Sequence, residues 1–410
     1  PAQPSCSCLD PCSPQSAVRG VQIASFHWGF AYYGFFTFWG LVTGYMCMNY
    51  HLPARPSSGL YPVLKDRIFG PAGKVIDVVP LLALIGGIVT SLGFGTTQFA
   101  SGMDFVFGVK PSNLMYVITI VVVTLSYTLS SGRGLKKGMQ FISDMNAYVY
   151  IILLLFLFLF GPTIYLLNLL TEVVGSTIMN YIPTAFNADA FDIGEGWSRM
   201  NTVFFMAWIM AYAPLIGLFL AKISRGRTVR QFLLVNIFVP GIFVLLWFVG
   251  FGGNAIYVDH YLNGTLYDIV SELGFPVANF ALLREMPLNT LTNPLVILAL
   301  FLSFITLADA MTGTIASMTV KDTLAEEAPV RVKFFWGLLI GASTILCLFA
   351  LGEIGTTALQ NMSIVYALPI FIITIFAIVS VMKMVNGTVD REMEELLKKE
   401  GRLPWEKEAK

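Results

Sequence analysis

The segment Tyr148–Leu167 reads YVYIILLLFLFLFGPTIYLL and decides the fold class of this chain. It carries no charged residue and is long enough to cross a bilayer as one helix, which needs about 20 apolar residues. Backbone polar groups find no water in hydrocarbon, so such a segment satisfies them within a helix. The whole chain of 410 residues is 56% hydrophobic and 12% charged, a balance typical of membrane proteins. The sequence therefore predicts an all-α polytopic membrane protein.

Further apolar stretches give nine predicted membrane spans in all. Their ends are approximate, because hydropathy locates a span better than its boundaries. The predicted spans cover residues 25–48, 79–101, 114–131, 145–168, 202–222, 232–255, 294–318, 333–352 and 359–383.

Basic residues are distributed unevenly between the two sides that nine alternating spans create. Most of the 25 Lys and Arg residues fall in the linkers 49–78, 132–144, 222–231 and 319–333 and in the tail from Lys383, which share one side. By the positive-inside rule that side is cytoplasmic, which predicts a plasma-membrane protein with a cytoplasmic C-terminus. The net charge is zero, and nothing in the charge pattern indicates nucleic-acid binding.

The chain divides into five predicted parts. Transporters built from inverted repeats have matching halves, and here four spans precede an external element while five follow it. We expect from this that the chain is N-terminally incomplete, with a genuine nine-span protein as the alternative. The parts are an atypical Pro-, Ser- and Cys-rich segment 1–20, a partial first repeat 21–168, an external amphipathic helix and loop 169–201, a second repeat 202–384 and a cytoplasmic tail 385–410.

The residues needed for enzymatic chemistry are not grouped in this sequence. The three histidines, His27, His51 and His260, are far apart, and no Cys/His spacing suggests a metal site. Phosphate-binding glycine loops are absent too. We therefore predict that the protein is not an enzyme and uses no cofactor or metal, which leaves binding and translocation within the membrane.

Aromatic residues in two spans supply the material for a binding site. Trp28, Tyr33 and Phe36 follow one another in the first span with separations of five and three, and Trp208 and Tyr212 lie one turn apart in the fifth. Rings arranged as a cage attract a quaternary ammonium without any counter-charge. The alternative is ordinary packing, because aromatic residues are common in membrane helices.

Four stretches of the sequence carry recognisable motifs: FHWG at 26–29, LYPVLKDRIFGPAG at 60–73, TSLG at 90–93 and TVFFMAWIMAYAPLIGLFLAKISRGRTVR at 202–230. The run ISRGRT in the last stretch is the most specific. Together they resemble the betaine/carnitine/choline transporter family, over a region from about residue 22 to the final span.

The resemblance implies a fold, an activity and an assembly. The fold has twelve spans with a core of two inverted five-helix repeats, as in leucine-type transporters, so the nine spans correspond to the family's fourth to twelfth. The activity is alternating-access transport of a quaternary ammonium or similar zwitterionic solute, and the assembly is a homotrimer. By position, Trp28, Tyr33 and Phe36 correspond to aromatic residues of the family's fourth helix, and Trp208 and Tyr212 fall on the box of its signature helix.

Several positions of the expected site depart from the family pattern. Met206 and Ile209 stand where the family box is usually rich in Trp, and Tyr212 stands where Trp is common. We predict that all three line the solute site. Methionine and isoleucine give contact area without an aromatic quadrupole, so these departures predict a weaker hold on a trimethylammonium head or a different solute.

The positions that bind sodium in sodium-coupled members are also altered. An ungapped alignment places Leu84, Ile88 and Leu307 where such members supply hydroxyl oxygens, while Ser91 and Thr306 keep theirs. Two residual oxygens are a poor shell for a small cation. We predict sodium-independent transport, by exchange or with protons, and a shift of the alignment by one turn is the alternative.

Asp309 lies within the seventh span, where a charged group is costly and indicates function. We predict that it pairs with Lys222, at the cytoplasmic end of the fifth span, as an inner gate. A carboxylate that reaches water is the alternative.

The sequence thus favours a carrier for a betaine-, carnitine- or choline-type solute that works in the lipid bilayer. Two alternatives remain at this stage. One is a carrier of the same fold for another small osmolyte, such as an amino acid or a sulfonium compound. The other is a truncated membrane protein that does not transport.

Overall fold

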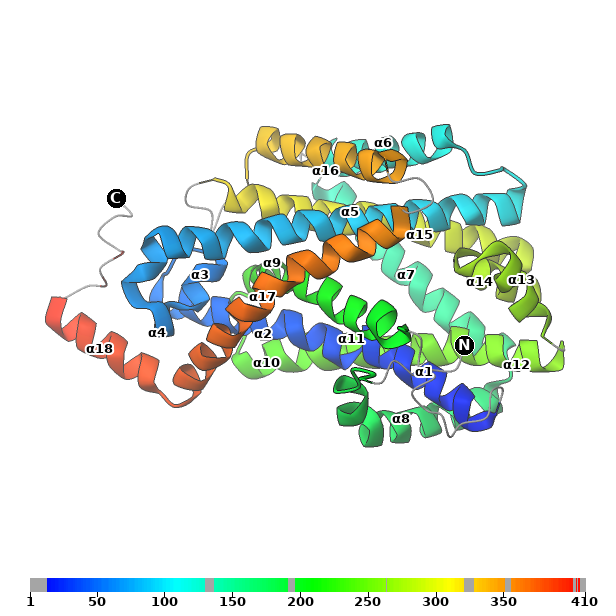
Figure 1. Ribbon diagram of the computed structural model, residues 1–410, viewed down its shortest axis with the longest axis horizontal. Coiled ribbons are helices and arrows are strands. Elements are labelled where there is room, and N and C mark those ends of the chain that lie inside the picture. Colours follow the sequence, from blue (N-terminus) through cyan, green and yellow to red (C-terminus); the bar gives the residue numbers. More distant parts are fainter. Residues whose placement is uncertain are drawn as a thin grey trace.

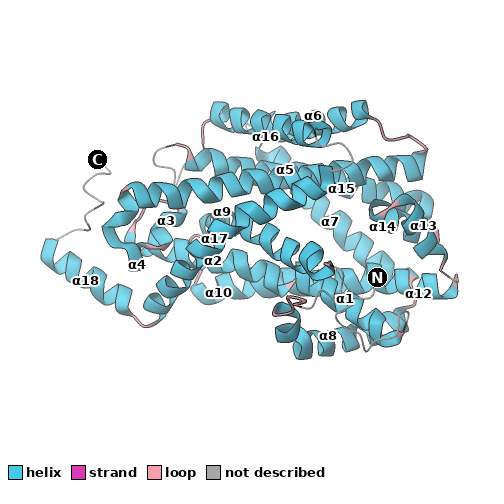
Figure 2. Ribbon diagram, viewed as in Figure 1, coloured by secondary structure: helices cyan, strands magenta, loops and turns pink. Residues whose placement is uncertain are grey.

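Helices make up nearly all of the described chain, and no strand occurs in it (Figure 2). The predicted all-α class is confirmed. The computed structural model describes residues 13–129, 136–190, 196–262, 264–320, 328–350 and 355–400, together with 403 and 405.

The helices pack side by side as a layered bundle, and α18 projects from one end of it (Figure 1). Short π-helical and 3₁₀ turns (η) connect or interrupt several of them. In chain order the elements are α1 Pro14–Trp28, α2 Phe30–Tyr50, α3 Pro56–Gly59, α4 Tyr61–Leu64, η1 Lys65–Phe69, α5 Pro71–Phe107, α6 Asn113–Leu129, α7 Lys136–Phe160, α8 Thr163–Ala185, η2 Arg199–Val203, α9 Phe204–Ile223, α10 Val229–Leu233, η3 Leu234–Phe238, α11 Val239–Phe248, η4 Val249–Gly253, α12 Asn254–Tyr261, α13 Thr265–Leu273, η5 Phe275–Val277, α14 Ala278–Arg284, α15 Asn289–Met318, α16 Val330–Ala350, α17 Gly355–Val385 and α18 Thr388–Glu400.

Seven helical stretches of the described chain are long and apolar enough to cross a membrane. Together with α2 and the shorter apolar α6, they coincide with the nine predicted spans, although the number of membrane crossings itself stays a prediction. The seven stretches are Pro71–Phe107, Met139–Phe160, Arg199–Ile223, Val229–Tyr261, Asn289–Met318, Val330–Phe349 and Ile364–Val385.

The first predicted span differs from the structure in two ways. The expected single helix over 25–48 is divided at Gly29 into α1 and α2. In addition, α1 begins at Pro14, because Ser13 caps it by accepting a hydrogen bond from the Ser16 backbone N–H at 3.2 Å and proline suits the first helical position. Residues 14–20 therefore belong to this helix, and residues 1–12 lie outside the described part of the chain.

The boundary between the fourth span and the external helix was predicted too late in the sequence. The helix α7 ends at Phe160, where the prediction ran to residue 168. Pro162 has no backbone N–H and disfavours a helical conformation of the residue before it, so the helix stops at the Gly161–Pro162 pair. The amphipathic helix α8 then begins at Thr163 and leaves large apolar side chains such as Ile164 and Met179 more than three-quarters exposed.

The helices α2 and α9 form a close pair that positions the candidate site. A Cβ atom on Gly40 would lie 2.9 Å from the backbone oxygen of Gly217, and one on Gly44 would lie 2.9 Å from the Cβ of Ala221. Small residues four positions apart on both helices thus let the two backbones approach closely, as in other membrane helix pairs. This close packing fixes the register of α2 relative to α9.

The longest helix, α5, packs against α9, α15 and α17 (Figure 1). Four of its glycines face rings from neighbouring helices, namely Gly86, Gly87, Gly95 and Gly102. A Cβ atom on Gly87 would lie 2.6 Å from the ring of Tyr212 on α9, and one on Gly95 would lie 2.2 Å from the ring of Phe304 on α15. The helix α5 therefore provides a packing surface for α9, α15 and α17 from the second half of the chain.

Candidate functional site

The break at Gly29 places aromatic residues on both sides of a bend. Trp28 ends α1 and Tyr32 lies in the first turn of α2. A Cβ atom on Gly29 would come 2.4 Å from the backbone oxygen of Ser25, so a larger residue does not fit this backbone conformation. The glycine of the FHWG stretch therefore shapes the site as well as the helix.

Rings from the first and fifth predicted spans meet at this bend. The ring centroids of Trp28 and Trp208 lie 5.8 Å apart with an interplanar angle of 82°, and those of Trp28 and Phe205 lie 5.3 Å apart. Both distances fall in the range of favourable aromatic pairs. The structure thus brings together Trp28 and Trp208, although their role in binding a solute stays a prediction.

Tyr32 occupies the centre of the ring set on α2, and the sequence analysis missed it. Its ring lies 5.4 Å from that of Trp28, in a stacked arrangement, and 4.7 Å from that of Phe36. The predicted residue Tyr33 lies beside it, 5.1 Å from Tyr32 and 6.5 Å from Phe36. The signal in the sequence was the repeated spacing of four from Trp28 to Tyr32 to Phe36, which follows one helical ridge more closely than the spacing that includes Tyr33.

Trp208 is the centre of the rings on the opposite side. Phe204 stacks on it at 5.5 Å, Phe94 of α5 meets it at 6.0 Å and Tyr212 lies 6.4 Å away. Phe94 was not found from the sequence, because it comes from a span without other candidate rings. We name the nine rings of Trp28, Tyr32, Tyr33, Phe36, Phe94, Phe204, Phe205, Trp208 and Tyr212 the ring cluster.

Met206 and Ile209, which were predicted to line the same site, lie on α9 within the main apolar core. Ile209 is 1% exposed, and Met206 is partly buried against that core. The structure places both on the helix that carries Trp208. Their contact with a solute stays a prediction.

The two predicted sodium-site hydroxyls have protein partners of their own. The Ser91 hydroxyl and the Tyr212 hydroxyl form a hydrogen bond of 2.5 Å between α5 and α9, and Thr306 donates to the backbone oxygen of Ser303 on its own helix at 3.1 Å. Leu84 and Ile88 are fully buried apolar side chains. Ser91 thus contacts the ring cluster, as the hydrogen-bond partner of the buried Tyr212 hydroxyl.

Leu307 also lies among apolar groups, packed against the main core. Within the described chain, no group of three or more His, Cys, Asp or Glu residues is arranged to hold a metal ion. That the protein uses no metal stays a prediction.

One edge of the ring cluster carries a buried histidine. His27 stacks on Phe205 at 5.0 Å and on Trp197 at 6.5 Å, and its Nε2 lies 3.0 Å from the hydroxyl oxygen of Thr202. Thr202 belongs to the π-helical turn η2 that leads into α9. This contact joins the end of α1 to the start of α9 next to Trp28.

The predicted pairing of Asp309 with Lys222 is not the one in the structure. The carboxylate of Asp309 forms an ion pair with Lys333 of α16 at 2.5 Å, and the Lys222 amine donates to the hydroxyl of Ser317 at 3.2 Å. Ser317 lies two turns beyond Asp309 on α15, a rise of about 12 Å. Lys222 therefore meets α15 too far along the helix to reach Asp309.

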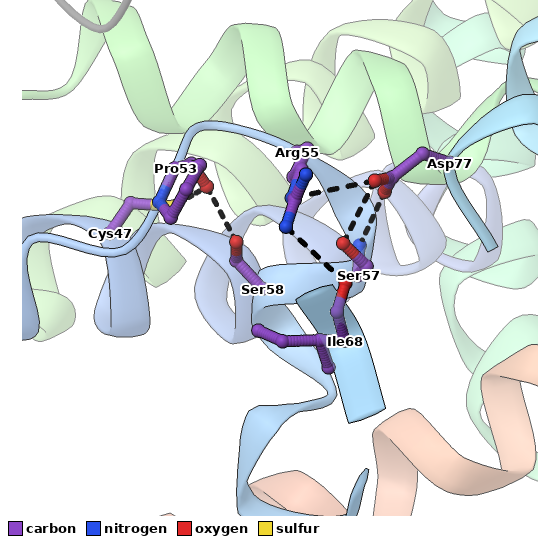
Figure 3. Close-up of polar contacts among 7 residues, drawn as sticks. All are labelled: Cys47, Pro53, Arg55, Ser57, Ser58, Ile68 and Asp77. Carbon is purple, nitrogen blue, oxygen red and sulfur yellow. Dashed lines mark hydrogen bonds and ion pairs between the residues drawn. The ribbon is translucent and has the colours of Figure 1, made fainter. Parts of the chain in front are cut away.

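A polar cluster fastens the linker between α2 and α5 (Figure 3). Asp77 of α5 accepts hydrogen bonds from the Ser57 backbone N–H at 2.8 Å and the Ser57 hydroxyl at 2.9 Å, and forms an ion pair with Arg55 at 3.4 Å. Arg55 also donates to the backbone oxygen of Ile68 at 3.3 Å. We name Arg55, Ser57 and Asp77 the polar clamp, which ties the buried helix α3 to the first turns of α5.

The C-terminal helix α18 docks beside the polar clamp at the same end of α2. Asp390 accepts hydrogen bonds from the hydroxyls of Tyr45, at 2.7 Å, and of Tyr50. Trp405 donates from its ring nitrogen to the Tyr50 backbone oxygen at 2.8 Å. Burial and the bond to Asp390 raise the pKa of the Tyr50 hydroxyl above its ordinary value, so this hydroxyl remains a donor throughout the physiological range.

The ring cluster can therefore offer π-faces and hydroxyl groups, while charged side chains gather at the other end of α2. Such a site suits a compact cation without strong hydrogen-bond donors, because ring quadrupoles stabilise it where water is excluded.

Sequence comparisons agree with this chemistry. Residues 2–389 match the betaine/carnitine/choline family of transporters. The chain is 33% identical to a probable glycine betaine transporter of Desulfitobacterium hafniense, over 92% of this chain and 75% of that protein. It is 31% identical to a glycine betaine transporter of Bacillus subtilis, over 95% of this chain and 73% of that protein.

A third relative is a high-affinity choline transport protein of Escherichia coli, 31% identical over 90% of this chain. The matched part is 54% of that relative, so the chain spans only about half the length of some of the proteins it resembles. Members of the matched family are multi-pass membrane transporters and not enzymes. With its apolar helices and this match over most of its length, the chain belongs to the betaine/carnitine/choline transporter family.

Proposed function

We propose that the protein carries a betaine- or choline-type solute across the membrane and holds its trimethylammonium group against the ring cluster. The observation that supports this most is the meeting of Trp28 at the Gly29 break with Trp208 of α9, at 5.8 Å. Each ring face that a desolvated quaternary ammonium contacts contributes roughly 0.5–2 kcal/mol. Several such faces hold the solute without a buried counter-charge, which would be costly in the membrane.

Binding requires the rings to move apart. In the T-shaped contact of Trp28 and Trp208, one ring edge covers part of the other ring's face, where a cation would lie. The solute therefore replaces a ring–ring contact by two cation–ring contacts. Gly29 and the π-helical turn η2 lie directly beside these rings and are the elements that can absorb such a displacement.

We further propose that transport follows alternating access in an inverted-repeat fold. The close pair of α2 and α9 moves as a unit relative to α5 and α15, because small residues hold its backbones together while side chains fill its boundary with α5. The Ser91–Tyr212 hydrogen bond crosses this boundary and breaks or forms as the pair moves.

Uptake into proteoliposomes tests the solute class. Radiolabelled glycine betaine, choline and carnitine are each offered alone and in competition with the other two, a sulfonium analogue of betaine and a neutral amino acid. Saturable uptake of at least one trimethylammonium compound is expected. Uptake of the amino acid alone would overturn the proposal and support a carrier for another small osmolyte. That alternative is considered because Met206 and Ile209 replace aromatic residues usual in the family. Specific binding without uptake would indicate a protein that does not transport.

Transport is proposed to be independent of sodium. Ser91 is bonded to Tyr212, Thr306 is bonded within its own helix, and Leu84, Ile88 and Leu307 offer no oxygen. We expect the uptake rate to stay within about twofold when potassium replaces sodium on both sides of the vesicle. Loss of uptake in potassium would show that other oxygens bind sodium.

The assembly and orientation are proposals from family likeness and charge. A homotrimer in the plasma membrane predicts a detergent-corrected mass of three times 45.2 kDa by light scattering. The exposed apolar face of α8, which includes Ile178 and Ile182, is available for lipid or for neighbouring subunits. A cytoplasmic C-terminus predicts that Lys399→Cys, in a variant whose five native cysteines are replaced by serine, reacts with an impermeant maleimide only after the cells are opened.

A further inference from the structure

A groove is lined by residues of α2 and α10 and by the end of α9 with the connection that follows it. The helices α2 and α10 lie side by side (Figure 1). Its cavity volume is about 90 Å³. Four polar side chains line it, those of Tyr45, Asn49, Ser224 and Arg227, and those of Asn49 and Arg227 are exposed. The apolar lining consists mainly of Gly40, Leu41, Gly44, Met48, Ala221, Val229 and Phe232.

Small residues of the close pair of α2 and α9 line the groove. Gly40 and Gly44 let α2 approach α9, and the ring of Phe232 from α10 reaches over Gly40 to within 2.7 Å of where a Cβ would lie. A Cβ on Gly44 would lie 2.9 Å from the Cβ of Ala221, so both glycines contact neighbouring groups and line the groove without side chains of their own. A flexible apolar chain can follow such a narrow lining.

Arg227 lines the groove, and two further arginines lie within three residues of it in the chain. Tyr45, which also lines the groove, donates its hydroxyl hydrogen bond to Asp390. Arg225, Arg227 and Arg230 are exposed, and in the described part of the chain none of them forms an ion pair. They occupy and follow the short connection between two helical stretches that are each long enough to cross a membrane. Such a connection lies near the depth of the lipid phosphates.

Apolar surface continues from the groove along the outside of the same element. Val235, Phe238, Val239 and Ile242 of η3 and α11 are each about half exposed or more. Exposed apolar side chains on a spanning helix face acyl chains. The groove therefore joins a basic rim at phosphate depth to a surface that is already in contact with hydrocarbon.

We propose that this groove is a binding site for an anionic phospholipid, with Arg227 on the phosphate and one acyl chain lying along α2. Charge complementarity favours a negatively charged head group, and the apolar lining distinguishes a lipid from free phosphate. Basic clusters beside spanning helices on the cytoplasmic side contribute attraction to anionic lipids of this kind. An acidic peptide would use the arginines but not the apolar lining beside Gly40 and Gly44.

The test is lipid binding to delipidated, purified full-length protein, followed by native mass spectrometry. Phosphatidylglycerol and phosphatidylcholine with identical acyl chains are titrated separately. We expect phosphatidylglycerol to bind at least about fivefold more tightly, and Arg227→Gln to remove about fivefold of its affinity. Arg331→Gln is the matched control, because Arg331 is exposed at the start of α16, away from the groove.

A second variant keeps the test decisive if the arginine variant is unstable. Val229→Trp places a bulky ring at the groove mouth and is expected to weaken phosphatidylglycerol binding while Arg225, Arg227 and Arg230 remain. Soluble glycerol phosphate is expected not to displace the lipid at millimolar concentration. Equal affinity for the two lipids, equal loss in Arg331→Gln, full displacement by glycerol phosphate, or unchanged binding in Val229→Trp would each overturn the proposal. Because the readout is binding, failure of the transport proposal would not affect it.

Discussion

The two ends of α2 are held by different forces. Near Gly29 the ring cluster packs through aromatic contacts at centroid distances of 4.7 to 6.5 Å. At the other end the polar clamp and the Tyr50–Asp390 bond fix the linker and α18 through hydrogen bonds and ion pairs to specific atoms. Contacts between rings lose little interaction free energy when the rings slide or exchange partners. A carboxylate that loses its hydrogen-bond donors is instead left partly desolvated, which costs free energy. The comparison teaches that the ring end can rearrange around a solute while the clamp end keeps the helices in register.

Removing two rings is the strongest test of the ring end of α2. The double variant Trp28→Leu, Trp208→Leu keeps apolar volume but loses both quadrupoles, so the Kd for glycine betaine should rise at least about tenfold. Phe30→Leu is the control, because Phe30 packs against Phe238 of η3 and not in the ring cluster. An unchanged Kd in the double variant would mean that the ring cluster is only packing.

Substituting the glycine at the break is expected to have the next largest effect. Gly29→Ala forces a Cβ to within 2.4 Å of the Ser25 oxygen, which costs about 1–3 kcal/mol through displaced backbone and lowers uptake severalfold. Gly34→Ala, five residues further on, has open space around its Cβ and should be neutral or slightly stabilising. Similar uptake by both variants would show that the break does not shape the site.

The clamp end predicts a loss of stability without a change in affinity. Asp77→Asn removes the ion pair with Arg55 and one carboxylate acceptor for Ser57, which should lower the free energy of unfolding by about 1.5 kcal/mol. The melting temperature in detergent measures this loss, and the Kd for glycine betaine should stay within about twofold. Asp66→Asn, an exposed carboxylate on the same linker, should leave the melting temperature unchanged. A large change in Kd for Asp77→Asn would contradict the division between the two ends.

The smallest expected effect concerns the bond that links the ring cluster to α5. Tyr212→Phe and Ser91→Ala each remove one side of the 2.5 Å hydrogen bond and should each cost about 1 kcal/mol of stability. The double variant should cost little more than either single variant, because the bond is already lost. Additive losses in this double-mutant cycle would show that the two hydroxyls do not act on each other.

Sequence reasoning located the helices and the main partners of the site but not their local detail. Runs such as 148–167 identify helices because hydrocarbon permits few other structures. Trp28 and Trp208 could be brought together by likeness to a known family. The break at Gly29 escaped notice, because a single glycine inside an apolar run is compatible with a continuous helix.

Contacts between distant segments were the least predictable feature. Asp309 was predicted to pair with Lys222, whereas its ion pair is with Lys333. Ser91 was predicted only to keep a hydroxyl in a shell too poor for sodium, and its hydrogen bond to Tyr212 was not predicted. Both contacts depend on the register between neighbouring helices, which decides which side chains meet. Tyr32 was missed for a related reason, since the choice between neighbouring tyrosines depends on the bend before them.

The most direct measurement is a structure of the protein in lipid nanodiscs with saturating glycine betaine. The account predicts density for the trimethylammonium group within about 6 Å of the ring centroids of Trp28 and Trp208. It also predicts that these centroids lie farther apart than the 5.8 Å seen here. Solute density elsewhere in the molecule, with the two rings still in their T-shaped contact, would contradict it.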